Sequence, residues 1–155
     1  MKRWICFLLA LLLPLCLLSC RSASKESAAD RLDGWLSEIG TPPAGAVYLS
    51  SLPLYGENGA ARPLSAELVT ALYARADGTC EYRGRVEEAA VYLSGRPDLP
   101  FEAAVLLCYG SADTEAVAAM CLRRVRLLSQ NGLADPESAR IECRGRAVYF
   151  LIRGK

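Results

Sequence analysis

The sequence predicts an α+β fold in which an antiparallel sheet of about four strands has its helices packed mainly on one face. Two pairs of apolar segments, each joined by a short turn, are typical of β-hairpins. Segments with apolar residues three and four positions apart precede and separate these pairs, as expected of amphipathic helices. The hydrophobic content is 52% of 155 residues, which is too high and too regularly patterned for a disordered chain.

The first twenty residues predict export and a lipid anchor. Lys2 and Arg3 precede an apolar run over residues 4–18, which is shorter than the roughly 20 residues that span a bilayer as a helix. Such proportions are typical of a signal peptide. The run ends in a sequence that resembles the lipobox of bacterial lipoproteins, where an aliphatic residue, a tolerant position and a small residue precede a cysteine: Leu17, Leu18, Ser19 and Cys20.

The lipobox resemblance implies that the Cys20 thiol takes a diacylglyceryl group and that a peptidase cuts before it. We therefore expect a signal peptide over residues 1–19, the lipidated Cys20 with a polar tether over residues 20–30, and a single α+β domain over residues 31–155. Two acyl chains anchor a protein stably, so we expect it at the extracytoplasmic face of the cell membrane. An ordinary signal peptide cut elsewhere, with Cys20 incidental, is the alternative.

Three segments of the domain are predicted to be helices. Ser65 is a good N-cap for the second, which should end near Ala76. The third covers residues 114–130, and the arginines of its last half suit the helix dipole and a solvated face: Arg123, Arg124 and Arg126. The first is short, ends at Gly40 and has one apolar, core-facing side: Leu32, Trp35, Leu36 and Ile39.

Five segments are predicted to be strands. A short strand around Val47 precedes a loop rich in turn formers, and the sequence leaves open whether it joins the sheet. Residues 87–94 and 101–109 flank a Gly/Pro loop, and the second is apolar on both faces, as in a covered central strand. Glu102 is its exception, and we expect it to reach water near the strand's start. The last two strands, residues 139–143 and 147–153, form a second hairpin.

Cysteine usage leaves two alternatives open. Four cysteines remain besides those of the signal region, which permits two disulfides in three connectivities: Cys80, Cys108, Cys121 and Cys143. The apolar surroundings of Cys108 and Cys121 favour reduced, buried thiols instead. No CxxC pair or metal-type spacing links the four, so we expect neither a metal site nor a redox-active pair.

Composition argues against catalysis and against nucleic-acid binding. The chain has no histidine, which removes the commonest general base and metal ligand. The formal net charge is +1, too small to attract nucleic acid. Glu87, Glu88 and Glu102 could lie near one hairpin as an acid–base pair, but surface carboxylates at strand ends are common. We therefore predict that the protein is not an enzyme and needs no cofactor.

Three segments resemble a family of small, uncharacterised lipoproteins of Gram-positive bacteria. They are LVTALYA at residues 68–74, AVYLSGRPDLPFEAAVLL at residues 90–107, and the largely apolar stretch over residues 145–152 near the end of the chain. The resemblance would cover about residues 32–155. The family is a domain of unknown function, so the resemblance implies a fold and a location and carries over no site residues.

Two functions remain, and neither is catalytic. The first is a membrane-anchored interaction module that docks on another envelope protein through a sheet edge or through the loop over residues 54–61. Tyr55, Glu57 and Asn58 are the candidate contacts in that loop. The alternative is a small-molecule-binding lipoprotein with a pocket between the sheet and the helices.

Overall fold

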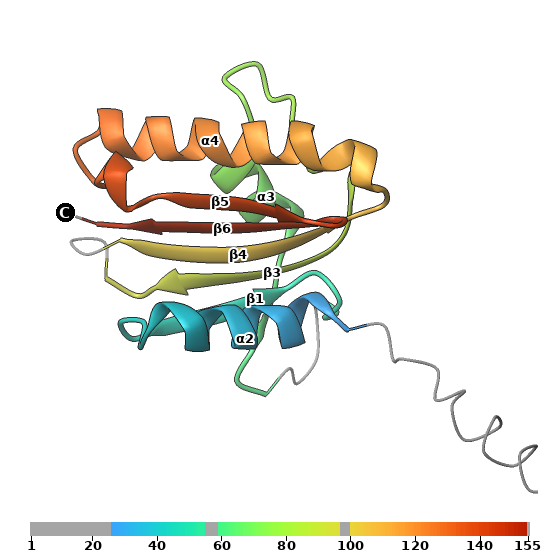
Figure 1. Ribbon diagram of the computed structural model, residues 1–155, viewed down its shortest axis with the longest axis horizontal. Helices are drawn as coiled ribbons and strands as arrows, with labels where there is room; N and C mark the ends of the chain where they lie inside the picture. The colour runs from blue at the N-terminus through green and yellow to red at the C-terminus, as the bar shows by residue number, and fades with distance from the viewer. Residues whose placement is uncertain (1–25, 55–58, 97–99, 155) are drawn as a thin grey trace, which may run out of the picture.

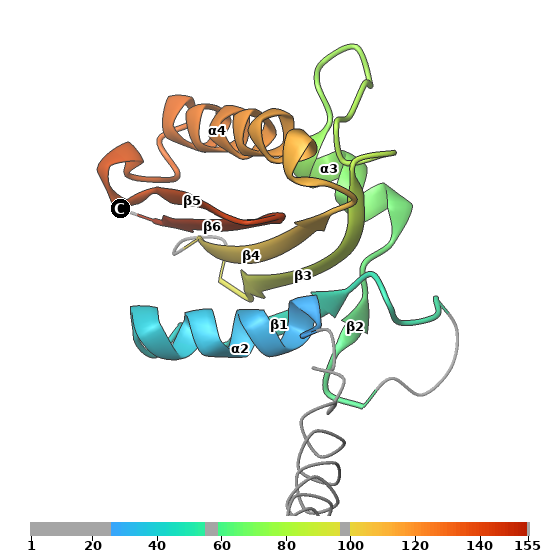
Figure 2. The ribbon, with the colours of Figure 1, turned by 45° about the vertical axis from the view of Figure 1, so that its right-hand side comes forward.

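The structure, a computed structural model, describes residues 26–54, 59–96 and 100–154. A six-stranded sheet lies between one helix on one face and two helices on the other, as Figures 1 and 2 show. Two 3-10 turns, Ser111–Asp113 and Pro136–Ser138, lead into the last helix and the fifth strand. The elements in chain order are α2 (Ala28–Ile39), β1 (Gly45–Leu49), β2 (Arg62–Pro63), α3 (Ala66–Tyr73), β3 (Val86–Ser94), β4 (Phe101–Cys108), α4 (Thr114–Gln130), β5 (Arg140–Arg144) and β6 (Ala147–Arg153).

The strand order is β2-β1-β3-β4-β6-β5. Neighbouring strands run antiparallel except β1 and β2, which are parallel. A tight turn joins β5 to β6, and Gly145 adopts a φ of 62° there, a conformation that glycine tolerates without steric cost. This order puts β3 and β4 in the middle of the sheet, with β2 and β5 at its two edges.

Both faces of the sheet are apolar, and a separate core forms on each. Along β4, Ala104 and Leu106 pack under α3 and α4, whereas Val105 and Leu107 pack against α2. Side chains that alternate along a strand point to opposite faces, so a strand buried along its whole length requires cover on both sides. Trp35 on α2 is 1% exposed at the centre of the second core.

Polar caps define where the first two described helices begin. The Ser27 hydroxyl accepts a hydrogen bond from the Asp30 amide at 3.1 Å, and the Asp30 carboxylate accepts one from the Ser27 amide at 3.2 Å. This reciprocal capping box satisfies amides that have no partner within the helix. The Ser65 hydroxyl caps α3 in the same way, through the Leu68 amide at 3.2 Å.

The α+β class, the core position of Trp35 and the helix over residues 114–130 are confirmed. The prediction of about four antiparallel strands is wrong in two details, because the sheet has six strands and β2 runs parallel to β1. Of the three described helices, α3 and α4 share one face, as expected of helices mainly on one side, and α2 covers the other. The strand around Val47 joins the sheet by pairing with β3, and α2 begins at Ala28, inside the expected tether.

Candidate functional site

The outer strand β5 presents unpaired backbone groups along one edge of the sheet. Arg144 pairs with Ala147 across the turn, so alternate residues from Arg144 backwards bond to β6. The amide and carbonyl groups of Ile141 and Cys143 therefore point away from the sheet. Among the residues that the structure describes, none forms a hydrogen bond to those groups.

The opposite edge of the sheet is a much poorer surface for strand addition. It is formed by β2, which has only two residues, Arg62 and Pro63, and by the start of β1, where residues 45–47 pair with β3 alone. Proline has no amide hydrogen and cannot donate to a strand ladder. The β5 edge is thus the better candidate for a docking surface.

An apolar groove of about 550 Å³ lies beside this edge, between α4 and β5. Leu122 on its wall is 42% exposed, so the groove presents apolar surface to solvent. The Ser129 hydroxyl is buried without a hydrogen-bond partner. The residues that matter for docking come from α4 and from the chain around the start of β5: Leu122, Val125, Arg126, Ser129, Ala139 and Ile141.

The position of the groove follows from the geometry of the sheet. Helix α4 packs on β5 and β6, and the sheet ends at β5. A further strand would lie about 4.8 Å beyond β5, and every second side chain of it would point to the face that α4 covers. The groove is therefore the space that the side chains of a seventh strand would fill. We call the groove and the outward groups of Ile141 and Cys143 the β5 edge site.

On the other face of β5, two arginines lie over aromatic rings. The Arg140 Cζ is 4.7 Å from the Trp35 ring centroid, and the Arg144 Cζ is 4.7 Å from that of Tyr149. Both donate to Glu142, at 2.6 Å from Arg140 Nη2 and 2.7 Å from Arg144 Nη2, and these hydrogen bonds lower the pKa of the Glu142 carboxyl. The ring contacts and the shared carboxylate hold both guanidinium groups beside the edge.

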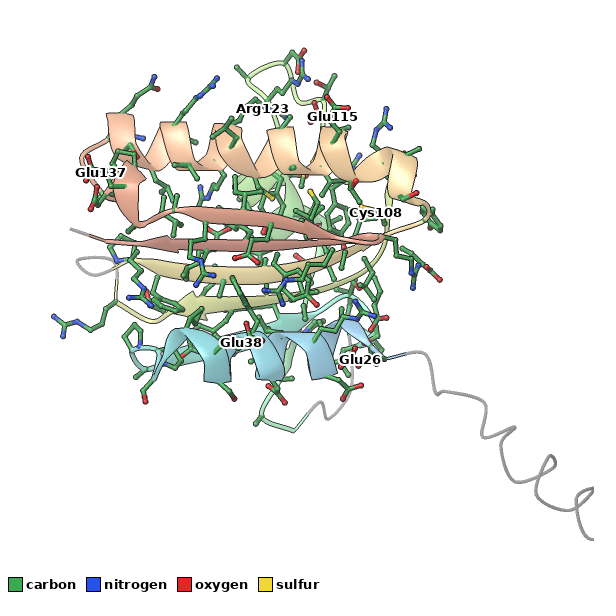
Figure 3. The ribbon with its side chains drawn as sticks, viewed as in Figure 1. Glu26, Glu38, Cys108, Glu115, Arg123 and Glu137 are labelled. Atoms are coloured by element: carbon green, nitrogen blue, oxygen red, sulfur yellow. The ribbon has the colours of Figure 1, made fainter. Side chains whose placement is uncertain are left out.

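Three further charges border the edge, those of Glu38, Glu137 and Arg126. Glu38 on α2 lies 3.6 Å from Arg144 and is largely exposed, and Figure 3 shows it on the side of the sheet opposite Glu137. Arg126 on α4 is exposed and forms no ion pair among the described residues. The prediction of a solvated arginine face on α4 is correct for Arg126 and wrong for Arg124, which pairs with the buried Glu102, while Arg123 pairs with Glu81.

A second candidate site contains a buried ion pair between the sheet and the helices. Glu102 is 3% exposed, and its Oε2 accepts a hydrogen bond from Arg124 Nε at 3.0 Å. The Glu102 Oε1 and the Tyr73 hydroxyl are buried and form no hydrogen bond of ordinary geometry, although the two side chains lie close enough to interact. Burial raises the pKa of Glu102, although Arg124 and the Tyr73 hydroxyl oppose the shift, and burial together with the Glu102 charge raises the pKa of Tyr73. The prediction that Glu102 reaches water is wrong, because α3 and α4 cover the strand's start.

A cavity of about 200 Å³ adjoins this ion pair. Its walls include Glu102 and Arg124 together with apolar side chains such as Leu72, Phe101 and Ile152. A buried carboxylate oxygen that lacks a donor is costly. The cavity could therefore accept a small apolar molecule that donates one hydrogen bond.

The three carboxylates suggested as an acid–base pair are not together. Glu87 forms an ion pair with Arg146, and Glu88 accepts a hydrogen bond from the Ala28 amide at 3.2 Å. Both lie at the start of β3, whereas Glu102 pairs in register with Leu93 near the strand's other end. Each carboxylate thus has a structural partner of its own.

The remaining predicted residues fall into two groups. The lipobox residues and the three loop candidates lie outside the described residues: Leu17, Leu18, Ser19, Cys20, Tyr55, Glu57 and Asn58. The other four cysteines are free thiols, of which Cys108 and Cys121 are buried and Cys143 is exposed. Across the described ranges, no group of Cys, Asp and Glu side chains could hold a metal ion.

The fold and the site define an α+β protein with a mixed six-stranded sheet, covered on both faces and open at one edge. Comparison of the chain with protein-family models, curated protein sequences and solved structures finds no match. The resemblance to uncharacterised lipoproteins therefore stays a prediction. In the described part of the chain, no helix is long and apolar enough to cross a membrane.

Proposed function

We propose that the protein is an exported lipoprotein, anchored at Cys20 to the extracytoplasmic face of the cell membrane, that works as a non-catalytic interaction module. It binds an extended segment of another envelope protein at the β5 edge site. The observation that carries this proposal is the free edge of β5 next to an apolar groove of about 550 Å³.

Strand addition uses both parts of the site. The amide and carbonyl groups of Ile141 and Cys143 supply main-chain hydrogen bonds, which give affinity without regard to sequence. The groove receives alternate side chains of the added strand, and their burial excludes water from Leu122 and Val125. An edge of this kind is a general hazard for aggregation, so the exposed apolar surface here is better explained by a partner that covers it.

The anchor limits where the partner can lie. Only a few residues separate Cys20 from Glu26, the first described residue, and extended chain spans at most about 3.5 Å per residue. The start of the domain at Glu26 therefore stays within roughly 25 Å of the lipid surface. This supports a partner that is itself at the membrane or in the adjacent cell wall.

A photo-crosslinking amino acid at position 143 of the full-length protein, expressed in its own cells, tests the proposal. We expect a discrete crosslinked envelope protein whose crosslinked peptide is an extended segment. The same amino acid at Glu115, which is exposed on α4, is the matched control and should give no such product. Crosslinks of equal yield from both positions, or none from position 143, would reject docking at β5.

Proline at Cys143 provides a second, structural test. The Cys143 amide points outward, so Cys143→Pro removes a donor from the edge and leaves the β5–β6 ladder intact. We expect it to abolish the crosslink when the photo-reactive group is moved to Ile141. Circular dichroism shows whether the variant keeps its fold, and an unchanged crosslink would contradict strand addition.

The alternative, a small-molecule-binding lipoprotein, is supported by the cavity next to Glu102. Isobutylamine, isobutanol and isobutyrate share one apolar body and differ in the polar group that would meet the Glu102 Oε1. If the cavity is a binding site, we expect the hydrogen-bond donors isobutylamine and isobutanol to raise the melting temperature of the protein. This increase should be lost in Glu102→Gln. Equal shifts with all three compounds, or none, would remove the alternative.

A further inference from the structure

We propose that the segment bound at the β5 edge alternates apolar residues, which enter the groove, with acidic residues, which lie opposite Arg140 and Arg144. This inference rests on the proposed function, because it assigns the chemistry of the strand that docks there. It adds a sequence preference to a surface whose main-chain hydrogen bonds have none.

The alternation follows from the pleat of the sheet. Ile141 packs against the core under α4, whereas Arg140 and Arg144 lie over aromatic rings on the α2 side. A strand added beyond β5 shares this alternation. Its side chains beside Ile141 and Cys143 enter the groove, and those beside the two arginines lie on the opposite face.

We call the positions of the added strand beside Ile141 and Cys143 the first row. The groove favours apolar side chains at these positions. Leu122 and Val125 form its α4 wall, and Ile141 contributes from β5. The buried Ser129 hydroxyl has no partner, so it can donate to a carbonyl or hydroxyl of the incoming segment. Small branched residues suit such a row, because they combine strand propensity with apolar surface.

The positions beside Arg140, Glu142 and Arg144 form the second row. This row faces a positive charge at each end and the negative charge of Glu142 in the middle. The side chains of Arg140 and Arg144 are 51% and 45% exposed, and both are turned towards Glu142 between them. A carboxylate opposite each arginine would gain a charge-assisted hydrogen bond. The position opposite Glu142 should be neutral, because that carboxylate already accepts from both arginines.

Further charged side chains lie around the edge. Arg126 lines the groove and has no ion pair among the described residues, Glu137 is exposed beside the groove residue Pro136, and Glu38 lies 3.6 Å from Arg144. These charges offset one another. The preference for an acidic segment over a basic one therefore rests on Arg140 and Arg144, which lie directly beside the added strand.

Three heptapeptides test this inference: VEVTVEV, VTVTVTV and VKVTVKV, which place Glu, Thr or Lys opposite the two arginines. Each is titrated into the isotope-labelled mature protein and followed by NMR at low salt. We expect VEVTVEV to bind about threefold to tenfold more tightly than VTVTVTV, and VKVTVKV to bind most weakly. The advantage of the acidic peptide should shrink as salt is raised to about 0.5 M.

A charge-reversed protein is the second arm of the experiment. The double variant with Arg140→Glu and Arg144→Glu should reverse the order and prefer VKVTVKV. Arg83→Glu, at an exposed arginine in the loop before β3, is the matched control and should leave the order unchanged. If the double variant still prefers the acidic peptide, the two arginines do not determine the charge preference at the second-row positions.

N-methylated peptides test strand addition without changing the protein. An antiparallel strand bonds β5 through its valine amides and a parallel one through the amides of the other row. N-methylation should therefore abolish binding when it is placed on the amides of one row and leave binding intact when it is placed on the other. The row whose methylation abolishes binding shows whether the peptide runs antiparallel or parallel to β5.

The outcomes separate the two proposals. Equal binding of all three peptides, with one sensitive row, leaves strand addition in place and overturns the acidic preference. Binding of none, or binding that neither N-methylated row weakens, counts against both the edge site and this inference. Dimerisation of the protein without peptide, lost in Cys143→Pro, would identify a second copy as the occupant and overturn the inference.

Discussion

Replacing Arg124 by leucine should destabilise the protein at neutral pH by about 3–5 kcal/mol, because it leaves the Glu102 charge buried and unpaired. The two side chains are only 15% and 4% exposed, so water screens the pair weakly. The Glu102 Oε1 already lacks a donor, and removal of Arg124 would leave the Oε2 without its donor as well. Urea denaturation of both proteins measures the difference in the free energy of unfolding.

The pH dependence of that difference distinguishes a lost ion pair from a simple packing defect. Burial raises the pKa of Glu102 above its ordinary value of 4.5. Between 4.5 and the raised pKa the native state holds more protons than the unfolded state, so stability falls as the pH rises. Arg124 opposes the shift, and without it this window extends to higher pH. The destabilisation should therefore be small near pH 4 and reach its full size near pH 7–8.

Two variants make the test specific. Arg126→Leu, at an exposed arginine of the same helix, should change stability by no more than about 0.5 kcal/mol. The double variant Glu102→Gln with Arg124→Leu should recover much of the loss, because no buried charge remains. A destabilisation by Arg124→Leu that is constant from pH 4 to pH 8, or no greater than that of Arg126→Leu, would refute the reasoning.

Three other predictions follow from single side chains. Tyr73→Phe should change the free energy of unfolding by no more than about 1 kcal/mol, since the buried hydroxyl forms no hydrogen bond of ordinary geometry; a larger loss in urea denaturation would reveal a hydrogen bond to the neighbouring Glu102 carboxylate. Cys143 should react with Ellman's reagent in the native protein, while Cys108 and Cys121 should react only after unfolding, because both are buried and burial raises the pKa of Cys108 to about 11; prompt reaction of either buried thiol would contradict the packing. Cys20→Ser should keep the melting temperature and abolish incorporation of labelled fatty acid, and labelling that persists would disprove the predicted anchor.

Much of the fold could be predicted because its signals are local. The helix over residues 114–130 has a clear apolar stripe, and glycine turns mark the β5–β6 hairpin. The cover on both faces is also indicated by the sequence, since β4 is apolar at nearly every position and Leu32 begins a separate apolar stripe on α2. The parallel pairing of β2 was not predictable, because a two-residue strand has no period to detect.

The docking surface depends on which strand is at the edge, and local pattern does not determine strand order. The sequence predicts residues 139–143 as one strand of a hairpin. It does not show whether a further strand pairs with their other side. Glu102 was misjudged for a related reason. Its place near the start of a strand predicts an exposed carboxylate. Its burial depends on the ion pair with Arg124 on α4, and the sequence does not show where that helix lies over the sheet.

The docking of α2 gives the last test of this two-faced core, and Trp35 is its most sensitive point. The ring is 1% exposed, packs edge-on against Tyr149 with centroids 5.4 Å apart, and lies under the Arg140 guanidinium. Trp35→Ala should therefore cost about 3–5 kcal/mol in urea denaturation, whereas Leu36→Ala, one position along and only partly buried, should cost roughly 1 kcal/mol. If the two variants lose the same amount, α2 does not dock through this ring. In that event Arg140 would lose the support that holds it beside the β5 edge, and the expected preference for an acidic strand would lose its structural basis.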